Sequence, residues 1–159
     1  MSKLLVVNPE KCASCRTCEL MCSFGRTKTF NPRLSAVTVI DYEEALTSVP
    51  VMCMQCDEAC CVKVCPVNAL FRDENGVIAK NSEKCIVCKM CVSACPLGNM
   101  SYSPTTKEVF KCDLCGGDPK CVKFCTSNAI QFVDPTDSPD RKKAVAERFK
   151  DVFGEEVSQ

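Results

Sequence analysis

Sixteen of the chain's 17 cysteines fall into four regularly spaced quartets. The first and third quartets read C-x2-C-x2-C-x3-C, and they comprise Cys12, Cys15, Cys18 and Cys22, then Cys85, Cys88, Cys91 and Cys95. The second and fourth quartets have a longer central gap, and they comprise Cys53, Cys56, Cys61 and Cys65, then Cys112, Cys115, Cys121 and Cys125. The shorter spacing is one by which thiolates bind [4Fe–4S] clusters. The cysteines therefore predict four such cofactors in a chain that transfers electrons.

Zinc is the main alternative cofactor, because paired C-x2-C motifs also bind structural zinc. Each quartet here adds a third nearby cysteine and a fourth after three residues, and Pro66 and Pro96 follow two of the quartets. A zinc ribbon does not need that pattern. The chain has no His, which excludes a Rieske centre and a Ser-His-Asp triad. We therefore expect iron–sulfur clusters and no catalytic residues.

Composition and charge narrow the possible partners and the compartment. The formal net charge is zero, so nucleic acid and membrane surfaces are not expected partners. No apolar run is long enough to insert into a membrane, and the run at residues 4–7 is too short for a signal peptide. These features predict a cytoplasmic protein. Cysteines account for much of the 46% apolar content and Trp is absent, so we expect folding to depend on the metal.

The sequence contains an internal repeat. Residues 8–12 (NPEKC) return as residues 81–85 (NSEKC), and residues 64–70 (VCPVNAL) return as residues 124–130 (FCTSNAI). The repeat predicts a duplicated unit with two quartets in each copy, which indicates ferredoxin-type modules.

Short elements between the quartets must position the cysteines. The apolar runs 4–7 and 130–133 predict strands that pair with each other, and segments 70–78 and 100–110 predict hairpins. We expect short helices within residues 16–24 and 89–94, so that neighbouring cysteines can face one cluster. The predicted fold class is α+β, with two bacterial-ferredoxin-like two-cluster modules built from short helices and β-hairpins.

The pairing of quartets decides the architecture. In two-cluster ferredoxins the fourth cysteine of each run binds the other cluster, which ties two quartets together. Only residues 66–84 separate quartets two and three, and this favours an inner module at 50–104 nested in an outer module at 1–30 and 105–134. Sequential pairing, one with two and three with four, remains the alternative.

Nested pairing predicts four ligand sets, each with three cysteines of one quartet and one of another. Cluster 1 takes Cys12, Cys15, Cys18 and Cys125, and cluster 2 takes Cys22, Cys112, Cys115 and Cys121. Cluster 3 takes Cys53, Cys56, Cys61 and Cys95, and cluster 4 takes Cys65, Cys85, Cys88 and Cys91. Cys61 is preferred over its neighbour Cys60 because it keeps the three-residue gap to Cys65. Cys60 is then expected to be a buried free thiol.

Three further features have two interpretations each. An insertion at residues 23–52, with an expected strand at 36–40, either covers a cluster or docks a partner. Residues 135–159 predict an amphipathic helix or tail, packed on the domain at 1–134 or anchored in another subunit. Seven basic residues near the ligands either raise cluster potentials or are solvated surface charges: Lys11, Arg16, Lys63, Lys84, Lys89, Lys111 and Lys123.

The order and spacing of the four quartets resemble the four-cluster subunits of the dimethyl sulfoxide reductase iron–sulfur family, over about residues 1–134. Residues 12–23 (CASCRTCELMCS) are similar to two branches, the small subunit of tungsten aldehyde oxidoreductases and the ferredoxin-like partner of carbon monoxide dehydrogenase. The resemblance implies nested pairing and a catalytic partner with tungsten or molybdenum. It further implies transfer to a flavin- or NAD-linked subunit, a ferredoxin or another copy. A hydrogenase partner and a freely diffusing polyferredoxin are the alternatives.

Overall fold

The computed structural model of the chain describes residues 3–134, which form short helices and four two-stranded antiparallel sheets. The strands are β1 (Leu4–Val7), β2 (Val37–Tyr42), β3 (Thr47–Met52), β4 (Leu70–Arg72), β5 (Ile78–Lys80), β6 (Ser101–Ser103), β7 (Glu108–Phe110) and β8 (Ile130–Val133). The α-helices are α1 (Thr17–Thr27), α2 (Cys60–Lys63), α3 (Met90–Ala94) and α4 (Lys120–Lys123), and the 3-10 helices are η1 (Pro9–Lys11), η2 (Pro32–Leu34) and η3 (Leu114–Gly117). The expected α+β mixture of short helices and hairpins is confirmed.

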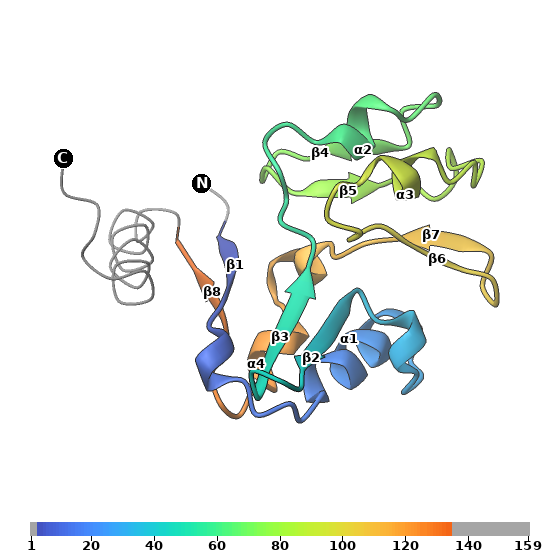
Figure 1. Ribbon diagram of the computed structural model, residues 1–159. Helices are drawn as coiled ribbons and strands as arrows, with labels where there is room; N and C mark the ends of the chain where they lie inside the picture. Colours follow the sequence, from blue (N-terminus) through green and yellow to red (C-terminus); the bar gives the residue numbers. More distant parts are fainter. Residues whose placement is uncertain (1–2, 135–159) are drawn as a thin grey trace, which may run out of the picture.

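The two ends of the described chain meet in one sheet. Strand β1 pairs antiparallel with β8, from Leu4 opposite Val133 to Val7 opposite Ile130, and the predicted pairing is confirmed. Ile130 is buried at 1% exposure, so the sheet contributes to the core. The pairing brings the start of the first quartet close to the end of the fourth, and α1 contacts α4 below the sheet (Figure 1).

Both predicted hairpins between the later quartets are present, as β4–β5 and β6–β7. The turn of β4–β5 is closed by Asp73, whose carboxylate accepts a hydrogen bond from the Val77 amide at 2.8 Å. Gly76 in this turn has a φ of 78°, a conformation that glycine adopts without steric cost. Figure 1 shows β4–β5 at the top of the molecule with α2 and α3, which contact each other, and β6–β7 beneath them.

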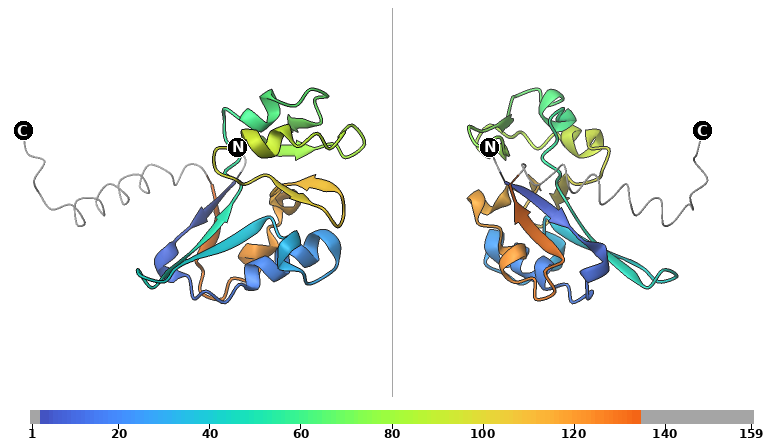
Figure 2. Two further views of the ribbon diagram at one scale, coloured as in Figure 1. Left: turned by 45° about the vertical axis from the view of Figure 1, so that its right-hand side comes forward. Right: turned by 90° about the vertical axis from the view of Figure 1, so that its left-hand side faces the viewer.

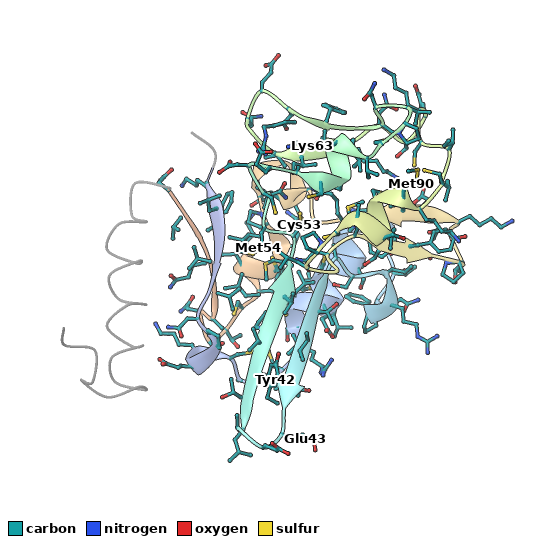
Figure 3. The ribbon with its side chains drawn as sticks, turned by 45° about the horizontal axis from the view of Figure 1, so that its top comes forward. Tyr42, Glu43, Cys53, Met54, Lys63 and Met90 are labelled. Atoms are coloured by element: carbon teal, nitrogen blue, oxygen red, sulfur yellow. The ribbon has the colours of Figure 1, made fainter. Side chains whose placement is uncertain are left out.

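The insertion forms the longer hairpin β2–β3. Its side chains alternate as expected for a half-buried strand, with Val37 and Val39 buried and Thr38 between them exposed. The buried face packs on Cys18 and Cys22 of α1, so the base of the hairpin covers cysteines of the first quartet. Its tip, with Tyr42 and Glu43, projects away from the rest of the chain (Figures 2 and 3).

Two hydrophobic cores divide the cysteines between them. The first core contains Cys18, Cys22 and Cys121 with partly buried Cys12 and Cys125, all of them from quartets one and four. The second core contains buried Cys91 with partly buried Cys61, Cys65 and Cys95, all of them from quartets two and three. Each core therefore combines cysteines from two quartets.

The predicted C-terminal helix at 135–159 lies outside the described residues. Within residues 3–134, no helix has the length and apolar character needed to span a membrane.

Candidate metal centres

The first and third quartets share one loop conformation. Ser14 and Arg16 flank the second cysteine of quartet one with φ values of 51° and 53°, and Val87 and Lys89 flank that of quartet three at 56° and 63°. The left-handed region is uncommon for residues other than glycine, and it is an outlier for a β-branched residue such as Val87. Loops that enter this region turn successive backbone N–H groups toward a concave side, which favours a bound anion. The repeated sequence thus folds into two loops of equivalent backbone conformation.

The turn after the fourth cysteine also repeats. Asn68, Gly98 and Asn128, each three residues after such a cysteine, have φ values of 49°, 64° and 54°, and these are residue types that enter the left-handed region most readily. The next amide N–H lies 3.2 Å from the sulfur of Cys65 and 3.3 Å from that of Cys95. Such N–H groups favour the thiolate form.

Two cavities lie among the cysteines of quartets two and three. One is lined by Cys53, Cys56 and Cys61 of quartet two together with Cys95 of quartet three, and the unpatterned Cys60 also lines it. The other is lined by the first three cysteines of quartet three together with the last cysteine of quartet two: Cys85, Cys88, Cys91 and Cys65. Each cavity thus receives three cysteines from one quartet and the fourth from its neighbour.

The remaining cysteines interact in two groups beside α1 and α4. Burial raises the pKa of Cys121, and the charges of Cys112, Cys22 and Cys115 raise it further. These four cysteines are therefore close together.

The second of these groups lies around Cys18. Burial raises the pKa of Cys18 to about 12, and the charges of Cys15 and Cys12 add to the rise. Cys125 packs against the same core as Cys12. A thiol with so high a pKa is protonated at neutral pH, so a metal must displace the proton to bind it.

The donor chemistry of these four groups fits iron–sulfur clusters. Both cavities are lined by at least four cysteines, and thiolates are the usual ligands of [4Fe–4S] clusters. Within residues 3–134, no three Cys, Asp or Glu side chains converge on the position of a single metal ion. In a cubane each thiolate binds a different iron, so the four sulfurs of a set do not meet at one point.

The expectation that Cys60 is a buried thiol is wrong, because its side chain is exposed. It begins the short helix α2, and its sulfur donates a weak 3.8 Å hydrogen bond to the carbonyl of Glu58. Cys61 is half-buried, and its pKa is raised first by burial and then by the charge of Cys53. Adjacent residues at the start of a helix point in different directions, and Cys61 is the more buried of the two, although both line the same cavity.

Replacing Cys60 by Ala should leave the iron content of the purified chain unchanged, because its exposed sulfur is outside the predicted ligand set. Cys61→Ala is the matched variant, and it should lose about four irons per chain. Iron analysis of both variants after anaerobic purification measures the difference. Loss of iron in Cys60→Ala, with a full complement in Cys61→Ala, would reverse the assignment.

Polar side chains connect the insertion to the first quartet, and of these only Arg16 was singled out from the sequence. The Asp41 carboxylate accepts hydrogen bonds from Ser48 at 2.6 Å, Ser14 at 2.8 Å and Arg16 at 2.5 Å. These contacts, with that of Ser48 the largest, hold the pKa of Asp41 at about 2. The buried Glu19 accepts a hydrogen bond from the Val39 amide at 2.6 Å. The carboxylate of Asp41 is therefore ionised throughout the neutral range and holds the hairpin against the loop at residues 14–16.

The fold and these centres define the chain as an iron–sulfur protein. Residues 45–135 match the 4Fe-4S dicluster domain, and the chain belongs to that family of ferredoxin-like electron-transfer proteins.

Its relatives are electron-transport proteins and subunits of oxidoreductases. The chain is 43% identical over 123 residues to the polyferredoxin-like subunit of aliphatic sulfonate oxidoreductase from Pyrococcus furiosus, covering 76% of this chain and 70% of that one. It is 32% identical to the electron transport protein HydN of Escherichia coli K12, covering 84% and 89%. Among solved structures it is similar to a chain of the active site complex BamBC of benzoyl coenzyme A reductase, with a TM-score of 0.50, 25% identity and coverage of 99% and 97%.

Proposed function

We propose that this chain is an electron-transfer subunit that carries four [4Fe–4S] clusters. The observation that carries the proposal is the pair of cavities lined by crossed cysteine sets, which correspond to the ligand sets proposed for clusters 3 and 4. The ligand set of cluster 2 is supported by the pKa of Cys121, which is raised by burial and then by the charges of Cys112, Cys22 and Cys115. The loop of Cys12, Cys15 and Cys18, with Cys125 in the same core, supports that of cluster 1.

The proposed ligand sets imply nested modules in a domain at 1–134. The outer module comprises residues 1–30 and 105–134, closed by the β1–β8 sheet, and the inner module comprises residues 50–104. The two cores support this division, since one holds cysteines of quartets one and four and the other those of quartets two and three. The insertion at 23–52 covers the outer module.

The proposed clusters form a line in the order 1, 2, 3 and 4. The charge of Cys18 adds to the raised pKa of Cys121, which supports proximity between the sets of clusters 1 and 2. Burial raises the pKa of Cys112 and the charge of Cys53 adds to the rise, which supports proximity between the sets of clusters 3 and 2. Cys15 of cluster 1 and Cys88 of cluster 4 are exposed, as is Cys56 of cluster 3. Electrons would enter at one end, pass along the line and leave at the other.

The proposed partner at one end is a catalytic oxidoreductase subunit, with a tungsten or molybdenum cofactor favoured by the resemblance of the first quartet. The relatives named as oxidoreductase subunits support a catalytic partner of this kind. At the other end we propose a flavin- or NAD-linked subunit or a ferredoxin, in a cytoplasmic complex, with no nucleic acid involved. Self-association is a further possibility, and a partner of the carbon monoxide dehydrogenase or hydrogenase type is the alternative.

Elemental analysis of the native protein, purified anaerobically with whatever binds it, tests this proposal. We expect about 16 irons per chain, together with tungsten or molybdenum in a co-purifying large subunit. Nickel would indicate a partner of the carbon monoxide dehydrogenase or hydrogenase type. Iron without a second subunit would indicate a freely diffusing polyferredoxin. Zinc in place of iron would contradict the proposed function itself.

A further inference from the structure

Lys111 differs from the other basic residues near the cysteine motifs in its burial. Its exposure is 6%, and among the lysines and arginines of residues 3–134 it alone is buried. The other six basic residues that the sequence singled out are exposed. Water screens their charges, whereas a charge inside the protein acts over longer distances.

Neutral groups satisfy the hydrogen bonds of the Lys111 ammonium. It donates to the carbonyl of Cys112 at 2.6 Å, to Oε1 of Gln55 at 3.4 Å and to the carbonyl of Ile78. These acceptors match the three donors of an ammonium group. No ion pair joins Lys111 to a carboxylate within residues 3–134. A buried cation without a counter-charge is strongly unfavourable, so a negative charge of another kind is needed nearby.

Cysteines of two different sets lie within reach of that cation. The Lys111 ammonium donates to the carbonyl of Cys112 and to that of Ile78. Ile78 lines the cavity that is also lined by Cys61. Cys61 belongs to the proposed set of cluster 3 and Cys112 to that of cluster 2. Gln55, which holds Lys111, connects the same two regions, because its Nε2 donates to the Cys112 carbonyl at 2.9 Å and its Oε1 accepts from the Ile78 amide at 2.9 Å.

We propose that Lys111 sets the potentials of the two middle clusters, 2 and 3, by placing one fixed positive charge between them. Reduction adds one electron to a cluster whose thiolates already make it negative, so a buried cation favours the reduced state. Coulomb energy falls with distance, so the terminal clusters 1 and 4 respond less. This inference rests on the proposed function.

A redox titration of the complete, cluster-loaded chain, followed by electron paramagnetic resonance, tests the role of Lys111. In Lys111→Gln we expect two of the four clusters to become harder to reduce by about tenfold, which is 59 mV for a one-electron step. The other two clusters should shift clearly less. Lys63→Gln is the matched control, because Lys63 lies between two ligands in sequence but is exposed and paired with Glu58. Its four potentials should stay at their wild-type values.

Lys111→Arg separates charge from packing. It keeps the positive charge, so both middle potentials should remain near those of the wild type. If Lys111→Gln loses iron while Lys111→Arg retains it, the clusters need the charge and the proposal holds. Loss of iron in both variants, or unchanged potentials in Lys111→Gln with about 16 irons, would overturn it. If the wild-type chain itself has fewer than four reducible clusters, the proposed function is wrong. That result is obtained without any substitution, so it is distinct from a failure of the Lys111 proposal.

Discussion

Removal of the clusters should unfold the described domain. The largest side chains with almost no exposure are Ile78, Ile130, Val37 and Val109, and no aromatic ring is among them. Cysteines occupy places in both cores, where bonds to iron would join segments that are far apart in sequence. A domain is stable by only about 5–15 kcal/mol, so the loss of these cross-links leaves too little apolar burial to offset the chain entropy.

Circular dichroism and urea titration of the chain before and after chelation of iron measure this effect. The cluster-loaded chain should unfold in one step together with the loss of its visible absorbance. The iron-free chain should show no cooperative transition. A metal-free chain that still unfolds cooperatively would contradict this expectation, and would show that the apolar side chains alone hold the fold.

Removing two cysteines of one crossed set should cost no more iron than removing one. Cys53→Ala and Cys95→Ala should each lose about four irons, and the double variant should lose the same four, leaving about 12. The reason is that both sulfurs line one cavity, although they belong to different quartets. Cys53→Ala combined with Cys85→Ala should instead lose about eight irons, because Cys85 lines the other cavity.

Iron analysis and electron paramagnetic resonance spectra of the single and double variants make this comparison. The spectra of Cys53→Ala and Cys95→Ala should lack the same signal. The matched second pair, Cys65→Ala and Cys85→Ala, should lack a different one. If the Cys53 and Cys95 losses add to about eight irons, the two sulfurs bind different clusters and the crossed sets are wrong.

The cysteine spacing by itself determined the chemistry of this protein. Three cysteines within seven residues, as at Cys12, Cys15 and Cys18, can reach one cluster whatever the rest of the chain does, because the reach of the backbone is local. The strands and hairpins around the cysteine quartets were predicted from equally local sequence signals. The strand at 4–7 came from an apolar β-branched run, and the β4–β5 hairpin from Asn75-Gly76. For the same reason these elements were predicted correctly.

Only the tertiary structure shows how the cysteines of different quartets are grouped, with those of quartets one and four in one core and those of quartets two and three in the other. Spacing left nested and sequential pairing open, because the fourth cysteine of a quartet can turn toward either neighbour until the strands and helices are packed. Burial was likewise undetermined by sequence. Cys60 and Cys61 are adjacent and identical, yet Cys60 is exposed and Cys61 is half-buried in α2. Lys111 was one of seven similar basic residues, and only the packing of β5, the Gln55 loop and Cys112 around it makes its charge a buried one. Solvation and long-range contact depend on the whole fold, whereas ligand type and local spacing do not.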